Sequence, residues 1–138
     1  MAGQIWINLP VKDLGKSKEF FSKIGFTLNQ VPGNPDEKAS LVIGDKNVNV
    51  MLFPEITFER FTGNNIADTT KGTEVLFTIG ADSKEEVDEI VTKVVKAGGS
   101  IYGKPHDQGW MYGAGFADLD GHRWNVLYMD MSKFPAEK

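Results

Sequence analysis

Residues 49–53 read NVMLF and residues 125–129 read NVLYM, with polar and apolar positions in the same phase. Both segments alternate as a strand with one buried face alternates. A match of five residues is easily found by chance, so this pair alone is modest evidence for a repeat. The stronger evidence is that the same order of expected elements precedes each segment. The chain is therefore predicted to contain two copies of one module.

The first expected module has the order βαβββ. Residues 4–11 alternate between apolar and polar positions, which predicts a half-buried strand. Asp13 is the expected N-cap of the next helix, because its carboxylate can accept from the free amides of the first turn. Gly25 is a natural left-handed end for that helix. Turn-forming segments at 32–35 and 44–45 separate the expected strands, which are residues 26–31, 39–43 and 48–53.

The second expected module repeats this order. Residues 74–79 alternate, and residues 83–86 read SKEE, the pattern of a capping box at the start of a helix. The Gly98-Gly99 pair is expected to end that helix. Three strands are then expected, over residues 100–103, 111–117 and 123–129.

The predicted fold class is α+β, with two pseudo-symmetric βαβββ modules forming a curved mixed sheet and the helices on its convex face. The modules span about residues 4–56 and 73–131, and a connector covers about residues 57–72. A chain of 138 residues has the length of a single domain. The alternative is an unrelated α+β domain without an internal repeat.

Composition excludes several classes of function. The net charge is −4 and the 15 Lys and Arg residues are scattered, which argues against a nucleic-acid-binding surface. The chain has no cysteine, so disulfides, thiolate zinc sites and a cysteine nucleophile are excluded. The sequence shows no signal peptide and no apolar stretch long enough to span a membrane. We therefore expect a cytoplasmic protein with neither a nucleic-acid nor a membrane partner.

Strand alternation also predicts which side chains face away from the helices. That face combines large apolar groups with polar ones, which is typical of a pocket for a small molecule. Two other interpretations stay open: a partly solvated surface, and a dimer interface containing a Glu74–Arg123 salt bridge. The predicted ligand-binding residues are Trp6, Asn8, Asn49, Met51, Phe53, Trp110, Tyr112, Arg123 and Asn125.

Two segments carry a family resemblance. One is NLPVKDL at residues 8–14, followed by Ser17, Phe20-Phe21 and residues 24–26; the other is FADLDGHRWNV at residues 116–126. Together with the paired modules, they resemble the glyoxalase/bleomycin-resistance (vicinal oxygen chelate) superfamily over essentially the whole chain. Members of this superfamily commonly dimerise, so the resemblance implies a homodimer with a small-molecule ligand.

The resemblance also implies where a metal would bind. In metal-dependent members, one ligand comes from the first strand and one from the last strand of each module. The matching positions here are Trp6, Asn49, Glu74 and Asn125. An indole cannot ligate a cation, and an amide oxygen is a weak ligand for nickel, zinc or iron. We expect no tight transition-metal site, and any divalent ion would be held weakly by Glu74 with Asn49 and Asn125.

Glu74 is the predicted catalytic residue. A partly desolvated carboxylate can act as a general base that enolises a substrate, or it can anchor an amine or hydroxyl group of a ligand. The two histidines are expected to be structural, His106 in a loop over residues 104–108 and His122 in a turn.

Three hypotheses of function follow, and they leave open whether the protein is an enzyme. The leading one is a protein that binds a small organic metabolite in a cleft without a tight transition-metal site or other cofactor. The second is a metal-dependent glyoxalase-like lyase or isomerase, or a dioxygenase, that acts on a carbonyl or aromatic substrate. The third is a structural role, in which the cleft serves only for dimerisation.

Overall fold

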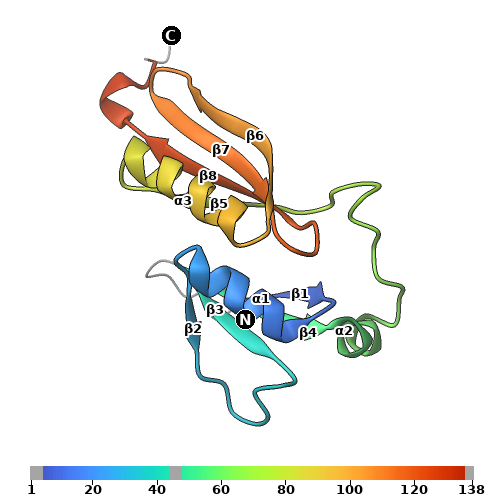
Figure 1. The fold of residues 1–138 in the computed structure, drawn as a ribbon. Coiled ribbons are helices and arrows are strands. Elements are labelled where there is room, and N and C mark those ends of the chain that lie inside the picture. Colours follow the sequence, from blue (N-terminus) through green and yellow to red (C-terminus); the bar gives the residue numbers. More distant parts are fainter. Residues whose placement is uncertain (1–4, 44–47, 136–138) are drawn as a thin grey trace. The chain divides into compact units, whose positions relative to one another are not determined.

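The structure, a computed structural model, describes residues 5–43 and 48–135. The chain divides into two compact units, Met1–Thr70 and Lys71–Lys138 (Figure 1). Each unit contains one four-stranded mixed sheet, which confirms the α+β class and the paired βαβββ modules. The predicted turn at residues 44–45 lies outside the described residues.

The first unit has the strand order β1-β4-β3-β2. The first and last strands, β1 and β4, pair in parallel, whereas β3 pairs antiparallel with both of its neighbours. The elements are β1 (Ile5–Val11), α1 (Leu14–Lys23), β2 (Thr27–Asn29), β3 (Ala39–Val42) and β4 (Val48–Pro54).

The second unit has the same topology, with the strand order β5-β8-β7-β6. Again the first and last strands pair in parallel and the two hairpin pairings are antiparallel. The elements are β5 (Leu76–Gly80), α3 (Lys84–Lys96), β6 (Ser100–Asp107), β7 (Met111–Ala117) and β8 (Arg123–Met129). This agreement of strand order and direction confirms the repeat.

The predicted helix ends are confirmed by their hydrogen bonds. The Asp13 carboxylate accepts from the amide of Lys16 at 3.0 Å, and the Ser83 hydroxyl accepts from the amide of Glu86 at 3.1 Å. Both helices end before a glycine with a positive φ, 106° at Gly25 and 98° at Gly98. Only glycine adopts this conformation without strain, so these residues set the helix lengths.

The helix that follows the first strand of each unit, α1 or α3, packs against one face of its sheet. In the first unit, Val50 and Leu52 of β4 are buried, together with Phe20 and Phe21 of α1. Alternation predicted Val48, Val50 and Leu52 on the helix side of β4. Val50 and Leu52 confirm it, whereas Val48, at the start of the strand, is exposed.

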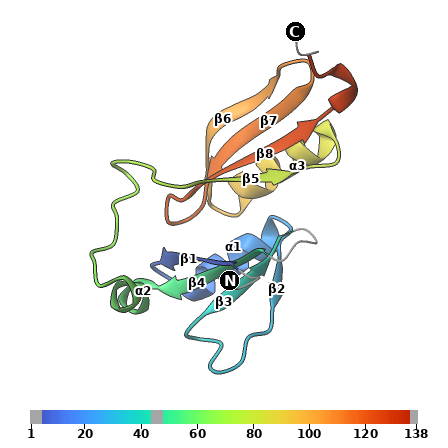
Figure 2. The same cartoon turned by 180° about the vertical axis from the view of Figure 1, so that it is seen from behind.

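In the second unit, α3 lies along one face of the sheet (Figures 1 and 2). Trp124 and Val126 of β8 are fully buried on this side, as predicted from the alternation. The Trp124 ring lies 4.6 Å from the ring of Phe77, measured between centroids. Such large aromatic side chains supply much of the apolar area that a small core buries.

Several element boundaries differ from the prediction, and β2 is shorter at both ends than the expected strand over residues 26–31. The expected connector over residues 57–72 overlaps a helix, α2 (Glu55–Thr62), which ends at Gly63 in the left-handed conformation. The ring of Phe61 in α2 packs edge-on against Phe53 of β4, with centroids 5.0 Å apart. Strand β5 begins at Leu76 rather than at residue 74, and β6 continues to Asp107 rather than ending at residue 103.

The turn between β7 and β8 is built on a buried carboxylate. Asp118 is only 6% exposed, and its Oδ1 accepts from the amides of Asp120 and His122, each at 3.0 Å. Its Oδ2 accepts from the indole nitrogen of Trp124 at 3.1 Å. The Asp118 side chain therefore joins the turn to the centre of the second core.

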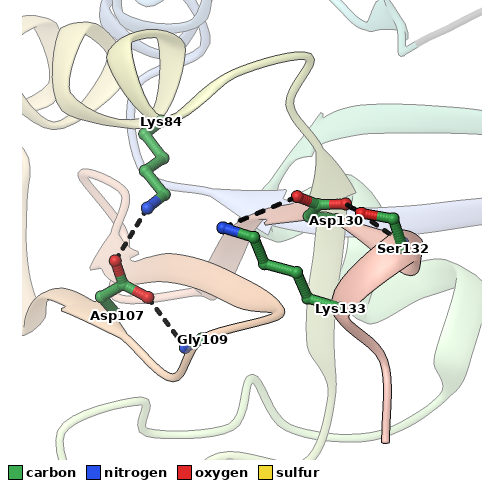
Figure 3. Close-up of polar contacts among 6 residues, drawn as sticks. All are labelled: Lys84, Asp107, Gly109, Asp130, Ser132 and Lys133. Atoms are coloured by element: carbon green, nitrogen blue, oxygen red, sulfur yellow. Dashed lines mark hydrogen bonds and ion pairs between the residues drawn. The ribbon is translucent and has the colours of Figure 1, made fainter.

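A polar cluster joins the start of α3 to the end of β6 (Figure 3). The Lys84 ammonium contacts Asp107 Oδ2 at 2.8 Å, and Asp107 Oδ1 accepts from the amide of Gly109 at 2.8 Å. Nearby, Asp130 caps the 3₁₀ helix η1 (Met131–Lys133) by accepting from the amide of Ser132. The Lys84 hydrogen bond and charge lower the pKa of Asp107, and the same contact raises the pKa of Lys84.

These two pKa shifts predict how the Lys84–Asp107 pair contributes at different pH values. A carboxyl with a lowered pKa stabilises the folded state above its unfolded pKa and loses that effect as pH falls through its folded pKa. We expect a small difference in unfolding free energy between the wild type and Lys84→Met at neutral pH, because the pair is exposed. The difference should shrink in acid as Asp107 is protonated, as urea titrations from pH 2 to 7 would measure. A Lys96→Met control should lack this pH dependence, and equal behaviour of the two variants would contradict the assignment.

Candidate functional site

A hollow of about 280 Å³ lies on the second sheet, over β6, β7 and β8. Gly113, Gly115, Asn125 and Leu127 line it, and they alternate with side chains that pack toward α3. The hollow therefore lies on the face of the sheet that α3 does not cover. Its other lining residues are Tyr102, Gly103, Lys104, His106, Gln108, Met111 and Ala114.

Two glycines of β7 provide the space for the side chains of this face. A Cβ at Gly115 would lie 2.4 Å from the Cζ atom of Tyr102. A Cβ at Gly113 would lie 2.2 Å from Leu127 Cδ2. Real Cβ atoms do not approach so closely, so glycine at these positions allows neighbouring side chains to lie flat across the strand.

The Tyr102 ring crosses β7 at Gly115 and reaches the next strand. Its hydroxyl donates to Oδ1 of Asn125 at 2.6 Å. The Arg123 guanidinium lies over the ring, 4.4 Å from its centroid, in a cation–π contact. Burial raises the pKa of Tyr102 despite the opposing charge of Arg123. The phenol therefore remains a hydrogen-bond donor at neutral pH.

Irregular pairing of β6 accompanies this arrangement. The register between β6 and β7 shifts between Ile101 and Gly103, and again between Gly103 and His106. Such bulges redirect side chains along a strand. Along this part of β6, Tyr102, Lys104 and His106 all line the hollow. Lys104 and His106 give it hydrogen-bond donors beside an apolar floor, an arrangement suited to a small molecule with an acceptor or anionic group.

The chain matches the family model described as the Glyoxalase/Bleomycin resistance protein/Dioxygenase superfamily over residues 3–126. The chain belongs to this superfamily. No curated protein matches it. Among solved structures, it is similar to the hypothetical protein SA1046 from S. aureus, with 36% identity and a TM-score of 0.81 over 93% of this chain and 94% of that one.

Two more distant structures share the fold of this superfamily. One is the genomically encoded fosfomycin resistance protein FosX from Listeria monocytogenes, with 19% identity and a TM-score of 0.66 over 96% of this chain and 98% of that one. The other is TnmS3, an antibiotic binding protein from Streptomyces sp. CB03234, with 18% identity and a TM-score of 0.62 over 94% and 97%.

The strand registers show which residues of the first and last strands lie side by side in each module. Trp6 is paired with Asn49 in the first unit. In the second unit Arg123 is paired with Leu76, and Asn125 is paired with Thr78. The ligand positions that the resemblance implies, Asn49, Glu74 and Asn125, stay predictions.

Glu74 lies outside the strand that was expected to begin with it. It is an exposed residue before β5, and the residue paired with Asn125 is Thr78. Parallel pairing therefore does not place the Glu74 backbone opposite Asn125. Within the described residues, no group of three or more His, Asp or Glu side chains is arranged to hold a metal ion.

The four positions implied for a metal do not form a strong donor set. The Trp6 indole has no acceptor atom, and the Asn49 amide offers only a neutral oxygen. The corresponding oxygen of Asn125 already accepts a hydrogen bond from Tyr102. A nickel, zinc or iron site calls for imidazole, thiolate or carboxylate ligands, so these residues do not fit such a metal.

The other predicted residues are divided between several places. Arg123 and Asn125 come together around Tyr102 in the second unit. In the first unit, the β1–β4 register brings Trp6 beside Asn49 and Asn8 beside Met51. These four are on the face of the first sheet opposite its buried apolar residues, and their ligand-binding role stays a prediction.

Three predicted aromatic residues pack against other side chains of the protein. Tyr112 donates its hydroxyl to Asp88 of α3 at 2.7 Å, which places it on the helix side of the sheet. Trp110 packs against Phe134 with centroids 4.6 Å apart, and Phe53 packs against α2 as described above. These contacts favour a packing role for all three rings over the predicted stacking on a ligand.

Sequence reasoning missed most of β6 as part of the site. His106 was expected in a loop, because Pro105 suggested that the strand had ended. The structure places His106 in β6 opposite Gly113. One signal was present: two glycines inside an otherwise apolar strand, Gly113 and Gly115, are typical of a close approach by neighbouring groups.

Proposed function

We propose that this protein binds a small organic molecule in the hollow over β6, β7 and β8, without a tight transition-metal site. The observation that carries the proposal is the Tyr102–Asn125 hydrogen bond, which engages the amide oxygen of Asn125. Lys104 and His106 line the same hollow and offer donors to an anionic or carbonyl group of the ligand. The fold is shared with a structure named as an antibiotic binding protein, which is in keeping with a binding role.

The ligand class follows from the size and lining of the hollow. A volume of about 280 Å³ lies just below the usual range of small-molecule pockets, roughly 300–1,000 Å³, so the ligand should be a small molecule rather than a peptide or a polymer. Met111 and Leu127 contribute apolar surface, whereas Lys104 and His106 contribute polar groups. We infer an amphipathic metabolite with an apolar body and one acceptor or anionic group.

Quaternary structure and location form part of the same proposal. Strands β1 and β5 are edges of their own sheets, and they carry exposed apolar residues such as Trp6 and Leu76. Exposed apolar edge strands are commonly covered by association. We propose a homodimer that works in the cytoplasm. Among the described residues, no helix has both the length and the apolar character needed to cross a membrane.

The test is a ligand screen on the metal-free protein, purified with a chelator. The probes are the methylglyoxal–glutathione adduct and catechol, with the glycopeptide bleomycin as a probe too large to enter the hollow, each tested by thermal shift and then by calorimetry. We expect at least one probe to bind. Asn125→Ala should weaken that binding by about tenfold, because it removes roughly one hydrogen bond to a polar group of the ligand. It also removes the acceptor that holds the Tyr102 hydroxyl. Glu74→Gln should leave the affinity nearly unchanged, because Glu74 is exposed before β5.

The same samples decide between this proposal and the metal-dependent alternative. Stoichiometric zinc, nickel or iron retained after dialysis, and lost in Glu74→Gln, would favour a glyoxalase-like enzyme. Turnover of the methylglyoxal adduct only after metal is added would have the same meaning. Light scattering of the same variants should show an unchanged dimer; dissociation in Asn125→Ala would favour a role of this face in assembly.

A further inference from the structure

A second hollow lies in the first unit, away from the strands that carry the residues discussed so far. It has a volume of about 380 Å³ and is bounded by α1, β2, the following loop and the start of β3. Leu28, Val31, Pro35 and Ala39 give it apolar walls, and two lysines, Lys18 and Lys38, stand at its lining. This volume is within the range of small-molecule pockets, roughly 300–1,000 Å³.

The wall formed by the β2–β3 loop is shaped by its own hydrogen bonds. The Lys18 ammonium donates to the carbonyl of Pro35 and ties the loop to α1. The side-chain oxygen of Asn34 accepts from the amide of Asp36 at 2.9 Å, and the backbone carbonyl of Asn34 accepts from the amide of Glu37 at 3.1 Å. The loop turns at Gly33, whose φ of 94° favours glycine. The hollow is thus bounded by a loop with defined turns.

The residues that line this hollow include two positively charged side chains, Lys18 and Lys38, and no negatively charged one. Three ion pairs within 4.0 Å join Lys23 to Glu19, Lys84 to Asp107 and Lys133 to Asp130, and neither Lys18 nor Lys38 takes part in them. Lys18 uses one of its three N–H groups on Pro35. The Lys38 ammonium lies over Gly33, 3.9 Å from the position of a Cβ on that residue. Both ammonium groups therefore have donors to offer to an anion.

We propose that this hollow is a second binding site, which takes an organic carboxylate with an apolar body. The two ammonium groups would hold the carboxylate by charge-assisted hydrogen bonds, which are stronger than hydrogen bonds between neutral groups. The apolar body would lie against Leu28, Val31 and Ala39. This site is separate from the hollow of the second unit and does not depend on the function proposed for it.

The experiment uses the full-length protein and two probes of the same shape, 1-naphthylacetate and its neutral amide. Binding is followed by amide chemical shifts in two-dimensional NMR. We expect the carboxylate to shift residues 28–39, and the amide to bind at least about tenfold more weakly. Lys38→Met should weaken carboxylate binding by a similar factor. Lys16→Met, an exposed lysine of α1 that does not line the hollow, should change it by less than about twofold.

Several outcomes would overturn this proposal. They are equal binding of the carboxylate and the amide, equal effects of Lys16→Met and Lys38→Met, shifts confined to residues 102–127, and no binding at all. Lys18→Met serves as a second variant, because it removes the other ammonium. Lys18→Met also removes the hydrogen bond that ties the loop to α1, so the amide signals of residues 30–38 in this variant can move without any probe. In that case the proposal is judged on Lys38→Met, because the Lys38 ammonium lies over the loop and does not tie it to α1.

Discussion

Replacing Asp118 with alanine is expected to lower the free energy of unfolding of the second unit by about 3–5 kcal/mol, the largest stability effect foreseen for a single side chain. Three N–H donors lose their acceptor at once: the amides of Asp120 and His122 and the indole of Trp124. Each buried donor left without a partner costs about 1–3 kcal/mol. Urea unfolding followed by circular dichroism would measure the loss.

Two further variants make the Asp118 test decisive. Asp118→Asn keeps an oxygen for the two turn amides but places an amide N–H₂ group where Oδ2 accepts from Trp124. We therefore expect a smaller loss, about 1–3 kcal/mol, and a folded protein if the alanine variant fails to fold. Asp82→Ala, which removes an exposed carboxylate near the start of α3, should have little effect. Equal stability of Asp82→Ala and Asp118→Ala would contradict the structural role.

The pH dependence of Asp118 has the opposite sign from that of Asp107. Burial raises the pKa of Asp118, despite the opposing effects of His122 and of the hydrogen bonds that the carboxylate accepts. A carboxyl with a raised folded pKa stabilises the folded state fully below its unfolded pKa and loses that contribution as pH rises through its folded pKa. The unfolding free energy of the wild type should therefore rise relative to that of Asp118→Asn as the pH is lowered from above the folded pKa of Asp118 to below its unfolded pKa.

The order of elements could be predicted from the sequence because it depends on local chemistry. Asp13 and Ser83 cap helices through their own side chains, and Gly25 and Gly98 end them through their own backbone freedom. The buried face of β8 followed from simple alternation. Each of these features is decided within a few residues, so one sequence is enough to find it.

The candidate site depends on contacts that no local pattern contains. The first segment missed is α2, whose Phe61 ring packs against Phe53 of the preceding strand β4. The second is the far half of β6, which continues past Pro105 because bulges realign it with β7.

Tyr102 illustrates why the site itself was not foreseen. Its contact with Asn125 spans β7 and joins residues 23 positions apart in the chain. Nothing near Tyr102 in the sequence marks it as a partner of Asn125. The space for this contact is a property of Gly115, which a sequence reveals only as an unusual glycine in a strand.

Gly115→Ala is therefore expected to have a large effect on the candidate site. The new Cβ would lie 2.4 Å from Cζ and 2.7 Å from Oη of Tyr102. Because the ring is 40% exposed, it can swing away from β7 toward solvent, which breaks its hydrogen bond to Asn125. We expect a loss of about 1–3 kcal/mol in unfolding free energy and at least about tenfold weaker binding of any ligand of this hollow.

A double-mutant cycle with Tyr102→Ala identifies the cause of that loss. If the new methyl group acts by displacing the ring, Gly115→Ala should cost little when the ring has already been removed, and the coupling should be about 1 kcal/mol or more. Gly80→Ala is the matched control, because a Cβ at Gly80 in β5 meets no atom within 4 Å and its φ is ordinary for a strand. The same loss from Gly115→Ala with and without the Tyr102 ring would show that the ring is not what this glycine accommodates. The position of the Tyr102 ring would then not determine the shape of the hollow, and its hydrogen bond to Asn125 would not contribute to binding.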